Sequence, residues 1–530
     1  MDLLIHGGTI IDGTGNPGYR GAVAVDGDRI RVIRGSIDAL TANTRLDATG
    51  RVVAPGFIDM HSHSGLSLLQ DPYHEAKIRQ GVTTEVIGVD GCSYAPFQQS
   101  TDLESFARLN SGLDGRLTTE DRWGTVAEYL SRLDAKAAVN TVFLIGNSAL
   151  RICVIGWADR VATDAEVADM RALLREGMSE GAFGLSTGLD YPPGAYASTD
   201  ELVAISSDTA AMGGIYHTHV RYQLGDGFID PFREAIEIGR RSEVPVHVTH
   251  LYRRQSASGG SASLLEVIEG ARSDGLDVTF DTYPYQWSST RLLILLPMWL
   301  QDGGPDVLIE RLSDPALRPR IREEVDRRAS SYGGRDVWER IHVGAFIRPE
   351  HHDHEGQTIA SIAKDREQHP ADAMCDLLVA EDLGINQVAA NPDPASLPRF
   401  LSHPLAMVGS DSVFVGERPS PRTYGTFPRI LGDLVRGERL ISLSDAVRKM
   451  TSYPAQRLGI ADRGMVRDGM KADLVVFDPD TVRAMATYES PRQYPVGIDH
   501  VIVNGQAVLM NGQMTGGLPG RALRHRQPDR

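Results

Sequence analysis

The middle of the chain alternates between short apolar runs and longer stretches with helical periodicity. Residues 164–181 and 230–243 are examples of the helical stretches, whereas the apolar runs have the length of buried strands. Strand–helix alternation predicts parallel strand pairing with crossover helices, and therefore an α/β fold. Eight runs of this kind fit the strands of a (β/α)8 barrel. They are 52–60, 83–89, 141–146, 182–189, 214–220, 244–250, 276–283 and 405–411.

Both ends of the chain have a different pattern, in which short β-like pieces are separated by turn residues. Several such pieces lie within 1–54, and similar ones return at 472–478 and 500–512. A β-rich head and a β-rich tail around a long middle predict one small discontinuous domain. We expect residues 1–54 together with 465–530 to form this small domain, and residues 55–464 to form the barrel.

A long segment separates the last two of the barrel runs. Residues 284–404 contain helical pieces and loops, so we expect an insertion over the mouth of the barrel. The first part of the insertion, 285–300, is rich in aromatic and aliphatic residues. This part either lines a pocket for an acyl group or forms the core of the insertion.

The composition is that of an ordinary globular protein, with 41% apolar and 23% charged residues. The 70 acidic residues exceed the 54 basic ones and give a net charge of −16, which argues against nucleic acid as a partner. The longest apolar run, 292–300, is too short to span a membrane and contains Pro297. The expected partner is therefore a small molecule, and the sequence predicts no particular oligomeric state.

Cysteine usage and the first residues of the chain favour a cytoplasmic location. The three cysteines, Cys92, Cys153 and Cys375, are widely scattered, which argues against a disulfide framework and suits a reducing compartment. Residues 1–8 contain no basic region followed by an apolar stretch, so we expect no secretory signal.

Residues that commonly bind metals stand at, or just beyond, the ends of the expected strands. His61 and His63 are two positions apart, a spacing that puts both side chains on the same side of a strand. The carboxyl ends of the strands are where barrel enzymes place their chemistry. Imidazole, thiolate and carboxylate groups together suit Zn²⁺. The candidates are His61, His63, Cys92, His219, His250 and Asp411.

Each of these candidates has a simpler explanation when it is taken alone. A single histidine after an apolar strand is more often a hydrogen-bonded structural residue, and a single cysteine is more often a small hydrophobe. All six at strand ends favour a metal site. His217 and His247 alternate to the opposite side of their strands, so we expect them to be structural. The histidine-rich stretch 350–356 falls in the expected insertion without a strand beside it, and a solvated loop is the favoured interpretation.

Longer motifs run almost from one end of the chain to the other. They include APGFIDMHSHS at 54–64, RQGVTTEVIGVDGCSYAP at 79–96, GAFGLSTGLDYPPG at 181–194, DTYPYQWSST at 281–290 and SPRTYGTFPRILG at 420–432. The His-x-His pair after the first strand resembles the amidohydrolase superfamily. The cysteine after the second strand, together with the TYP and PRTYGTFPR motifs, indicates a narrower group within this superfamily. These features resemble the N-acyl-D-amino-acid deacylases, or D-aminoacylases.

This resemblance implies a distorted (β/α)8 barrel with a small β-sandwich that is built from both chain ends. It also implies one or two zinc ions as the cofactor. His61 and His63 would serve one metal position, and His219 and His250 would serve the other. Cys92 would be a strong ligand at the second position and could bridge the two.

The resemblance also assigns roles in catalysis and substrate binding. Asp411 would be the catalytic carboxylate, which takes a proton from a zinc-activated water and then passes it to the departing amine. Tyr191 either helps to stabilise the oxyanion or is a packed loop residue. Tyr283, Ser289 and Arg422 match the residues that hold the substrate carboxylate, and the other interpretation of Arg422 is a surface ion pair.

Two positions depart from the deacylase pattern. Tyr252 stands where relatives commonly have a lysine that also holds the substrate carboxylate, and Asn147 stands where they often have histidine. Arg253 and Arg254 are nearby cations that could replace this lysine. The metal-binding residues are intact, so hydrolysis is better supported than the identity of the acid.

The leading hypothesis is a zinc-dependent hydrolase that cleaves the amide bond of an N-acyl-D-amino acid and releases a D-amino acid and a carboxylate. Its partner is then a small amide substrate that bears a carboxylate. The missing lysine favours an alternative with the same chemistry on another amide, such as a peptide-like or biosynthetic metabolite. A second alternative is a non-catalytic zinc-binding barrel, against which the retained Asp411 argues.

Overall fold

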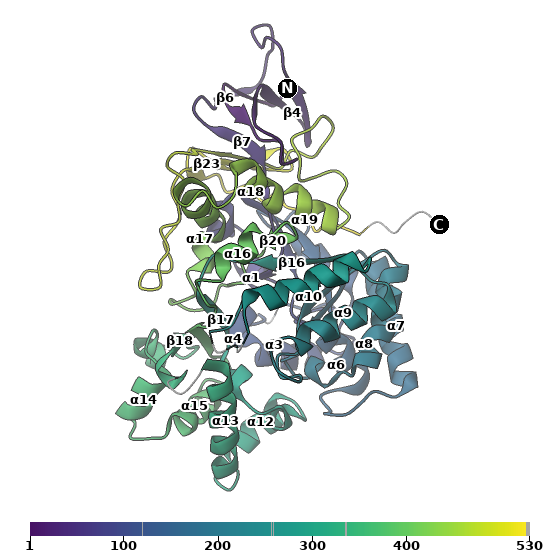
Figure 1. Ribbon diagram of the computed structural model, residues 1–530, viewed down its shortest axis with the longest axis vertical. Coiled ribbons are helices and arrows are strands. Elements are labelled where there is room, and N and C mark those ends of the chain that lie inside the picture. The colour runs from purple at the N-terminus through teal and green to yellow at the C-terminus, as the bar shows by residue number, and fades with distance from the viewer. Residues whose placement is uncertain (119, 256, 258, 334–336, 526–530) are drawn as a thin grey trace.

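A computed structural model describes residues 1–118, 120–255, 257, 259–333 and 337–525 of the chain. The molecule is elongated, with the N-terminal strands at one end and the helices of the 284–404 segment at the other (Figure 1). The alternating strands and helices lie between these two ends.

Parallel strands from the middle of the chain form the central part of the fold. Two sheets contain them, one with the order β11-β10-β8 and one with the order β12-β13-β14-β15-β16-β20. The strands are β8 (Phe57–Asp59), β10 (Val82–Ile87), β11 (Asn140–Phe143), β12 (Ile145–Gly146), β13 (Gly184–Gly188), β14 (Ile215–His219), β15 (Val246–Val248), β16 (Val278–Thr282) and β20 (Ala406–Val408). The expected strand runs and their parallel pairing are therefore confirmed, except that the first half of the run 52–60 is a separate strand, Val52–Pro55, in another sheet.

Further contacts connect the first and last of these strands. The backbone N–H of Met60, just after β8, donates to the carbonyl of Val408 in β20 over 3.1 Å. Immediately beyond, β9 (Ser62–His63) pairs in parallel with β21 (Ser412–Val413). The two ends of the parallel series thus lie side by side.

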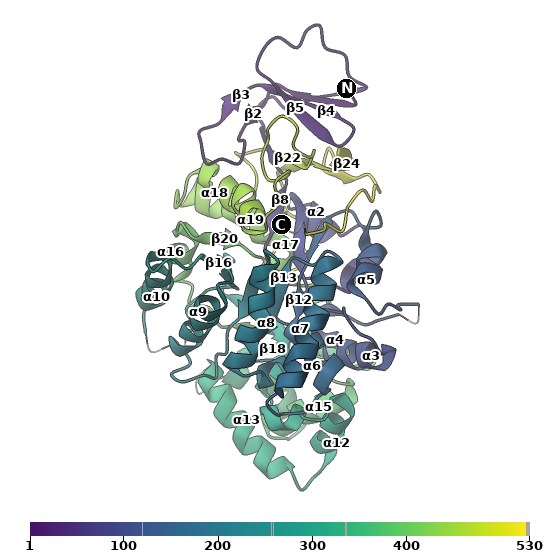
Figure 2. The ribbon, with the colours of Figure 1, turned by 90° about the vertical axis from the view of Figure 1, so that its right-hand side faces the viewer.

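Helices on the outer side of these strands connect one strand to the next. Figure 2 shows α7 (Asp164–Ser179), α8 (Thr199–Ala211) and α9 (Asp230–Ser242) side by side over the strands. The helix α7 begins at a capping box, in which Thr163 Oγ1 accepts from the Glu166 N–H and the Glu166 carboxylate accepts from the Thr163 N–H. Because helices cover their outer side, strands such as β10 are buried along their whole length.

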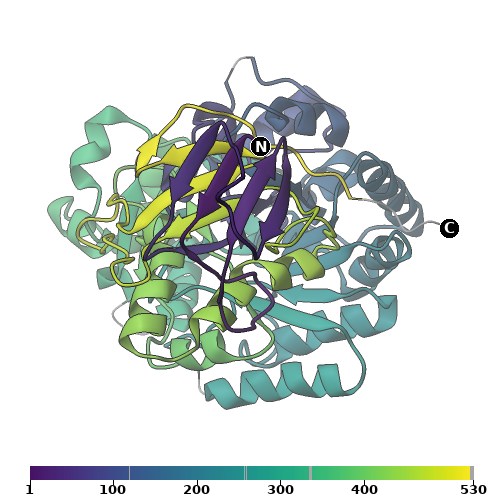
Figure 3. The ribbon, with the colours of Figure 1, turned by 90° about the horizontal axis from the view of Figure 1, so that it is seen from above.

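Segments from both ends of the chain form two sheets that pack together. The sheet with the order β25-β24-β23-β22-β7-β2-β3 contains β7 (Val52–Pro55) between β22 (Leu474–Phe477) and β2 (Thr9–Ile10). Its other strands are β3 (Tyr19–Arg20), β23 (Ile498–Val503), β24 (Gln506–Met510) and β25 (Gln513–Met514). A second sheet covers it, as Figure 3 shows from above, and has the order β5-β4-β1-β6. Its strands are β1 (Leu3–His6), β4 (Ala22–Asp26), β5 (Arg29–Ile33) and β6 (Thr44–Asp47). A shared apolar cluster joins the two and contains Leu3, Ile5, Val23, Val25, Val53, Leu474, Val476 and Ile502.

The segment between β16 and β20 has its own sheet, helices and core. The sheet has the antiparallel order β17-β19-β18, formed by β17 (Trp287–Arg291), β18 (Ile341–Ala345) and β19 (Asn386–Ala390). The main helices here are α12 (Pro305–Ser313), α13 (Arg318–Gly333) and α15 (Pro370–Ala380). Leu292 to Leu296 are buried in the apolar cluster of this segment, so this part of the 285–300 stretch belongs to a core.

Within the described residues, the structure contains no helix with the length and apolar character needed to cross a membrane.

Candidate metal centre and active site

The first pair of histidines faces a carboxylate that follows the last parallel strand. His61 comes two residues after β8, and β9 carries His63. The backbone N–H of Asp411 donates to the His61 carbonyl over 2.9 Å, which places the two segments together. Asp411 Oδ1 then lies 3.6 Å from His61 Nε2 and 3.4 Å from His63 Nε2.

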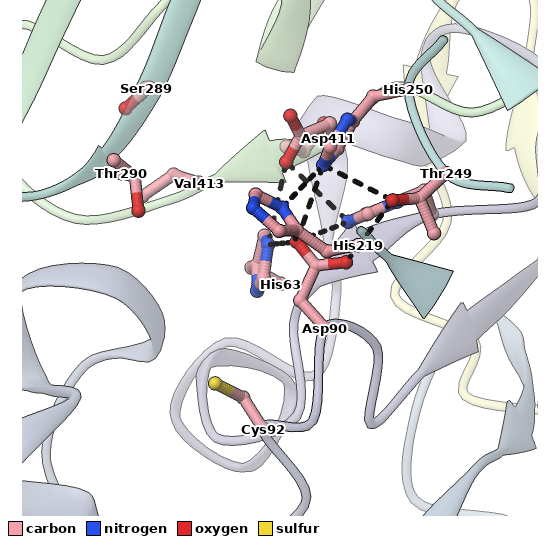
Figure 4. A network of polar contacts seen from close by, with 12 residues as sticks. His63, Asp90, Cys92, His219, Thr249, His250, Ser289, Thr290, Asp411 and Val413 are labelled. Carbon is pink, nitrogen blue, oxygen red and sulfur yellow. Dashed lines mark hydrogen bonds and ion pairs between the residues drawn. The ribbon is translucent and has the colours of Figure 1, made fainter. Parts of the chain in front are cut away.

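The second pair of histidines comes from two adjacent strands. His219 is the last residue of β14, and His250 lies two residues beyond β15. Their ring nitrogens, Nδ1 of His219 and Nε2 of His250, are 3.0 Å apart. Figure 4 shows both rings turned toward the Asp411 side of the site.

Asp90 lies between the two histidine pairs. Its Oδ2 atom is 3.4 Å from His61 Nε2, 3.7 Å from His63 Nε2 and 3.6 Å from the nearest ring nitrogens of both His219 and His250. The residue follows β10 with a φ of 52°, a sharp turn that aims the carboxylate inward. Burial alone would raise the pKa of Asp90, but the surrounding histidines hold it well below its usual range.

These residues form two groups with closely spaced ligand atoms, and Asp90 belongs to both. One group contains His61, His63, Asp90 and Asp411, and the other contains Asp90, His219 and His250, with ligand atoms within 4.8 Å of one another in each group. All six residues are buried. The sequence reasoning missed Asp90, although it stands directly after the apolar run 83–89, at the position type that marked the other candidates.

The donor atoms of this site fit a bound cation. Both ring nitrogens of His61 and the Nδ1 atom of His250 are buried without a hydrogen-bond partner in the described part of the chain. Buried polar atoms are normally paired, so the unpaired His61 Nε2, which lies 3.4 Å from Asp90 Oδ2 and 3.6 Å from Asp411 Oδ1, indicates a missing positive partner. Nitrogen and carboxylate oxygen ligands in this number suit Zn²⁺.

Cys92 lies outside both groups. Its Sγ atom is 3.6 Å from Asn110 Oδ1, and Figure 4 shows it to one side of the histidines while the Asp90 carboxylate points among them. Burial raises the pKa of the Cys92 thiol to about 12. The structure thus places Asp90, and not Cys92, between the two histidine pairs, and the role of Cys92 as a metal ligand stays a prediction from the sequence.

A third group lies behind the first and includes one of the two histidines that we expected to be structural. His61, His217 and Asp281 form this group, and His247 contacts it through Asp281. Asp281 Oδ2 is 3.0 Å from His247 Nε2, and Asp281 Oδ1 accepts from the backbone N–H of His250 over 2.9 Å. Burial lowers the pKa of both His217 and His247 well below its usual value, so both rings are neutral. Asp281 thus fixes the backbone of His250 from behind.

Arg422 forms a buried ion pair with Asp411. Arg422 is the first residue of α17 (Arg422–Arg429) and is fully buried. Its Nη1 atom lies 2.8 Å from Asp411 Oδ2, and its Nη2 donates to the carbonyl of Ser289 over 3.0 Å. Burial alone would raise the pKa of Asp411, but Arg422 and then the histidines hold it well below its usual range. The ion pair that we considered for Arg422 exists, but inside the site instead of on the surface.

The other expected substrate-binding residues line the same region. The Tyr283 ring lies 4.4 Å from the Arg422 guanidinium carbon. The Ser289 hydroxyl donates to Asn386 Oδ1 over 3.0 Å. The Tyr191 ring centroid is 5.0 Å from that of His219. The structure thus brings all three close to the histidine groups or to Arg422, and all three are buried.

The residues at the two departures from the deacylase pattern are also buried. The Tyr252 ring is 6.0 Å from the rings of both His250 and Tyr283. Asn147 Nδ2 donates to the carbonyl of Gly194 over 3.0 Å. Tyr252 therefore takes a place beside the site without bringing a charge to it.

The nearby cations that could replace the missing lysine have other contacts. Arg253 Nη1 pairs with Asp393 at 2.9 Å, and the Arg254 guanidinium carbon lies 3.7 Å from the Tyr222 ring centroid. The histidine-rich stretch falls largely within the short 3-10 helix η4 (Pro349–His354), which has no buried residue, and His351 in it contacts Glu381. Neither feature contributes to the histidine groups described above.

An α/β fold whose parallel strands end in converging imidazoles and carboxylates defines a metal-dependent hydrolase. The chain matches the model of the amidohydrolase family over residues 45–509. It therefore belongs to this family and is a hydrolase that acts on amide bonds.

Characterised relatives match the chain from end to end. A D-aminoacylase from Alcaligenes xylosoxydans xylosoxydans is 38% identical over 530 residues, which cover 99% of this chain and 97% of the relative. The crystal structure of the N-acyl-D-glutamate deacylase from Bordetella bronchiseptica, complexed with zinc and a phosphonate inhibitor, has a TM-score of 0.84 and 33% identity and covers 99% of this chain and 100% of that one. A D-aminoacylase structure with a binuclear metal centre has a TM-score of 0.82 and 34% identity at the same coverage.

Proposed function

We propose that this chain is a zinc-dependent deacylase, which hydrolyses the amide bond of an N-acyl-D-amino acid to give a D-amino acid and a carboxylate. The observation that carries the proposal is the position of Asp90 between two histidine pairs, with Asp411 beside the first pair. The D-aminoacylase and the N-acyl-D-glutamate deacylase named above support the substrate class. The partner is accordingly a small amide substrate that bears a carboxylate.

The proposed architecture is a distorted (β/α)8 barrel over residues 55–464 with an insertion at 284–404. The Met60–Val408 hydrogen bond and the β9–β21 pairing support closure of the barrel. The two packed sheets from both chain ends support a small β-sandwich domain built from 1–54 and 465–530.

The proposed zinc ligands are the residues of the two groups that share Asp90. His61, His63 and Asp411 would hold one ion, and His219 and His250 would hold the other, with the Asp90 carboxylate within reach of both groups. Zinc at these positions would act as a Lewis acid that lowers the pKa of water and polarises a carbonyl oxygen. One or two ions fit this set, since each group already contains three or more ligand atoms.

In the proposed reaction, Asp411 transfers the proton. Its Oδ1 atom faces His61 and His63, whereas its Oδ2 atom is held by Arg422. Arg422 keeps the carboxylate ionised and fixed in orientation, so Oδ1 is ready to accept a proton from the attacking water. As the amide C–N bond breaks, Asp411 returns this proton to the amine nitrogen.

Arg422, Tyr283 and Ser289 are proposed to bind the substrate carboxylate, and Tyr191 is proposed to stand beside the reacting carbonyl. Arg422 Nε is buried without a hydrogen-bond partner among the described residues. It can therefore donate to the substrate carboxylate while Nη1 stays near Asp411. The Tyr191 ring lies against His219, on the side of the second group.

The test is a metal analysis of the purified protein combined with an amine-release assay on N-acetyl-D- and N-acetyl-L-amino acids. We expect bound zinc and hydrolysis that is confined to the D series. Hydrolysis of neither series by the zinc-loaded protein would contradict the proposed function and favour the non-catalytic alternative.

A second candidate substrate class is suggested by Tyr252. This residue has a phenol where relatives commonly have a lysine that holds the substrate carboxylate. An enzyme with one cation fewer for the substrate carboxylate would act on another amide, such as a peptide-like or biosynthetic metabolite. Hydrolysis of such amides at a higher kcat/KM than any N-acetyl-D-amino acid would decide for this candidate.

A further inference from the structure

Arg291 is a buried guanidinium close to the proposed active site. It is the last residue of β17, two positions after Ser289, and its side chain is 1% exposed. Its guanidinium carbon lies 4.7 Å from the Tyr191 ring centroid, and the same ring lies 5.0 Å from that of His219. A single aromatic ring thus connects Arg291 with the second histidine group.

Arg291 has no anionic partner in the part of the chain that the structure describes. No carboxylate lies within 4.0 Å of it there, and its buried Nε and Nη1 atoms have no hydrogen-bond partner. The other fully buried arginines near the strand ends are paired: Arg151 Nη1 donates to both oxygens of Glu201, and Arg422 faces Asp411. A buried cation without a partner is strongly unfavourable, and the contact with one ring offsets only part of that cost.

The carboxylates nearest to this region are occupied elsewhere. Asp114 Oδ1 lies 3.5 Å from His63 Nδ1, and its Oδ2 accepts from the Tyr94 hydroxyl over 2.6 Å. Asp90 faces the four histidines. Among the described residues, the protein therefore provides positive charge at Arg291 without an acidic group that neutralises it.

We propose that Arg291 is a second anion anchor, which binds a second carboxylate of the substrate. The inference rests on the proposed function and narrows its substrate class to N-acylated amino acids with two carboxylates. Arg422 takes the α-carboxylate, and the free Nε and Nη1 of Arg291 provide donors for the second. A guanidinium suits this task, because its planar fork matches a carboxylate through two parallel hydrogen bonds.

The second carboxylate has two possible sources in such a substrate. It is either the side chain of an acidic amino acid or the far end of a dicarboxylic acyl group. Both present the same planar anion to Arg291, so the experiment must include one matched pair of substrates for each source.

The experiment measures kcat/KM of the zinc-loaded enzyme for two pairs of substrates. The first pair is N-acetyl-D-glutamate and N-acetyl-D-glutamine, and the second is N-succinyl-D-leucine and N-butyryl-D-leucine. In at least one pair, we expect the dianionic member to be preferred by about 100-fold, because a site built to pair a polar group strongly rejects the analogue that lacks it. Equal values within both pairs would overturn the proposal.

Variants of Arg291 then assign the preference to this side chain. Arg291→Met should remove the preference while the monoanionic member of the pair keeps its kcat/KM within a few-fold. Arg291→Lys retains the charge without the fork and should retain a part of the preference. Arg253→Met is the matched control, since it removes a cation that is paired with Asp393 outside the site. We expect this variant to prefer the dianionic substrate as strongly as the wild type does.

A binding measurement gives a readout that is independent of turnover and of a folding defect. Calorimetric titration of the zinc-loaded wild type, Arg291→Lys and Arg291→Met with the dicarboxylic product of the preferred pair should show weakening in that order, with circular dichroism confirming the fold of each. Equal affinity of all three proteins would overturn the role of Arg291. Failure of the wild type to hydrolyse both the dianionic and the monoanionic substrates would instead contradict the proposed function, so the two failures are distinguishable.

Discussion

Three residues that converge at the strand ends have positive backbone φ angles: Asp90 at 52°, His250 at 34° and Asp411 at 49°. Such conformations are costly for residues other than glycine, and they persist where the surrounding structure holds them. Here they turn the chain sharply after a buried strand, so that the side chain points toward the neighbouring strand ends. The strain is thus associated with residues that we propose as metal ligands.

The roles of Asp90 and Cys92 can be separated by mutation. We expect Asp90→Ala to lose most of its bound zinc, because its carboxylate lies within 3.7 Å of ring nitrogens in both histidine pairs. Cys92→Ala should keep the zinc content of the wild type, because the Cys92 thiol is buried against Asn110. Zinc analysis of both purified variants is the measurement. Loss of zinc from the Cys92 variant alone would restore the expectation from the sequence.

Asp411→Asn should separate proton transfer from metal binding. The amide has nearly the same shape but cannot accept the proton, so we expect kcat to fall by about 10²- to 10⁴-fold with zinc content largely unchanged. Asp200→Asn, a change at an exposed ion pair with Arg241, is the control and should leave kcat unchanged. Near-normal turnover of the Asp411 variant would end this assignment.

Arg422→Met should affect both substrate binding and turnover. The variant lacks the buried guanidinium that faces Asp411 Oδ2, so we expect KM for N-acyl-D-amino acids to rise at least about 10-fold, with a lower kcat. Steady-state kinetics on one N-acetyl-D-amino acid is the measurement. An unchanged KM would count against the role of Arg422 in binding the substrate carboxylate.

At the scale of elements, a buried polar network holds the strands that carry the first histidine pair. Lys77 of α2 (Glu75–Ile78) contacts Asp59 at the end of β8 and lies 3.5 Å from Glu85 of β10. Glu85 also accepts from the Ser64 hydroxyl over 2.7 Å and lies 3.0 Å from His74 Nε2. Because each charge has an opposite charge or a donor beside it, the network fixes the ends of β8 and β10 relative to each other.

This network predicts a dependence of stability on pH. Burial would raise the pKa of Glu85, but His74 and Lys77 outweigh this effect and lower it from 4.5 to about 2. A lowered folded-state pKa means that the unfolded chain binds more protons, so the stabilisation by Glu85 is present above pH 4.5 and is lost as the pH falls to about 2.

Glu85→Gln checks this dependence. Urea unfolding of the metal-free proteins should show a stability difference between the wild type and this variant that shrinks by about 3 kcal/mol from pH 5 to pH 2, at about 1.4 kcal/mol per pKa unit. A difference that stays constant over this pH range would contradict the ionic role of Glu85.

At the scale of the whole molecule, the two chain ends complete one sheet. β7 lies between β2 and β22, and its apolar residue Val53 shares a cluster with Leu474, Val476 and Ile502. Removing residues 465–530 would expose both this cluster and the free edge of β7, which directly precedes β8 in the chain. We expect the truncated chain to precipitate or to unfold without a cooperative transition, as monitored by circular dichroism. A cooperative transition at the wild-type temperature would show that the small domain is dispensable.

The strands and the residues at their ends show how much the sequence could predict. The α/β alternation was readable because buried parallel strands are continuous apolar runs and the helices between them have their own period. The same rule placed the histidines and Asp411 at the strand ends, and the structure brings them together. The rule did not show whether Asp90 or Cys92 faces the histidines, because both residues follow the run 83–89. The sequence does not show how far the turn after this run rotates the chain.

The sequence by itself determined the order of strands and helices, the family and the residues that stand near the strand ends, because periodicity and motifs are local properties of the chain. Only the tertiary structure decided which atoms meet: Asp90 lies between the histidines, Arg422 lies against Asp411, and Arg291 is buried without a carboxylate partner among the residues that the structure describes. These contacts join residues that are up to 350 positions apart, as His61 and Asp411 are. Their distances depend on backbone turns and on the packing of neighbouring strands, which no local pattern specifies.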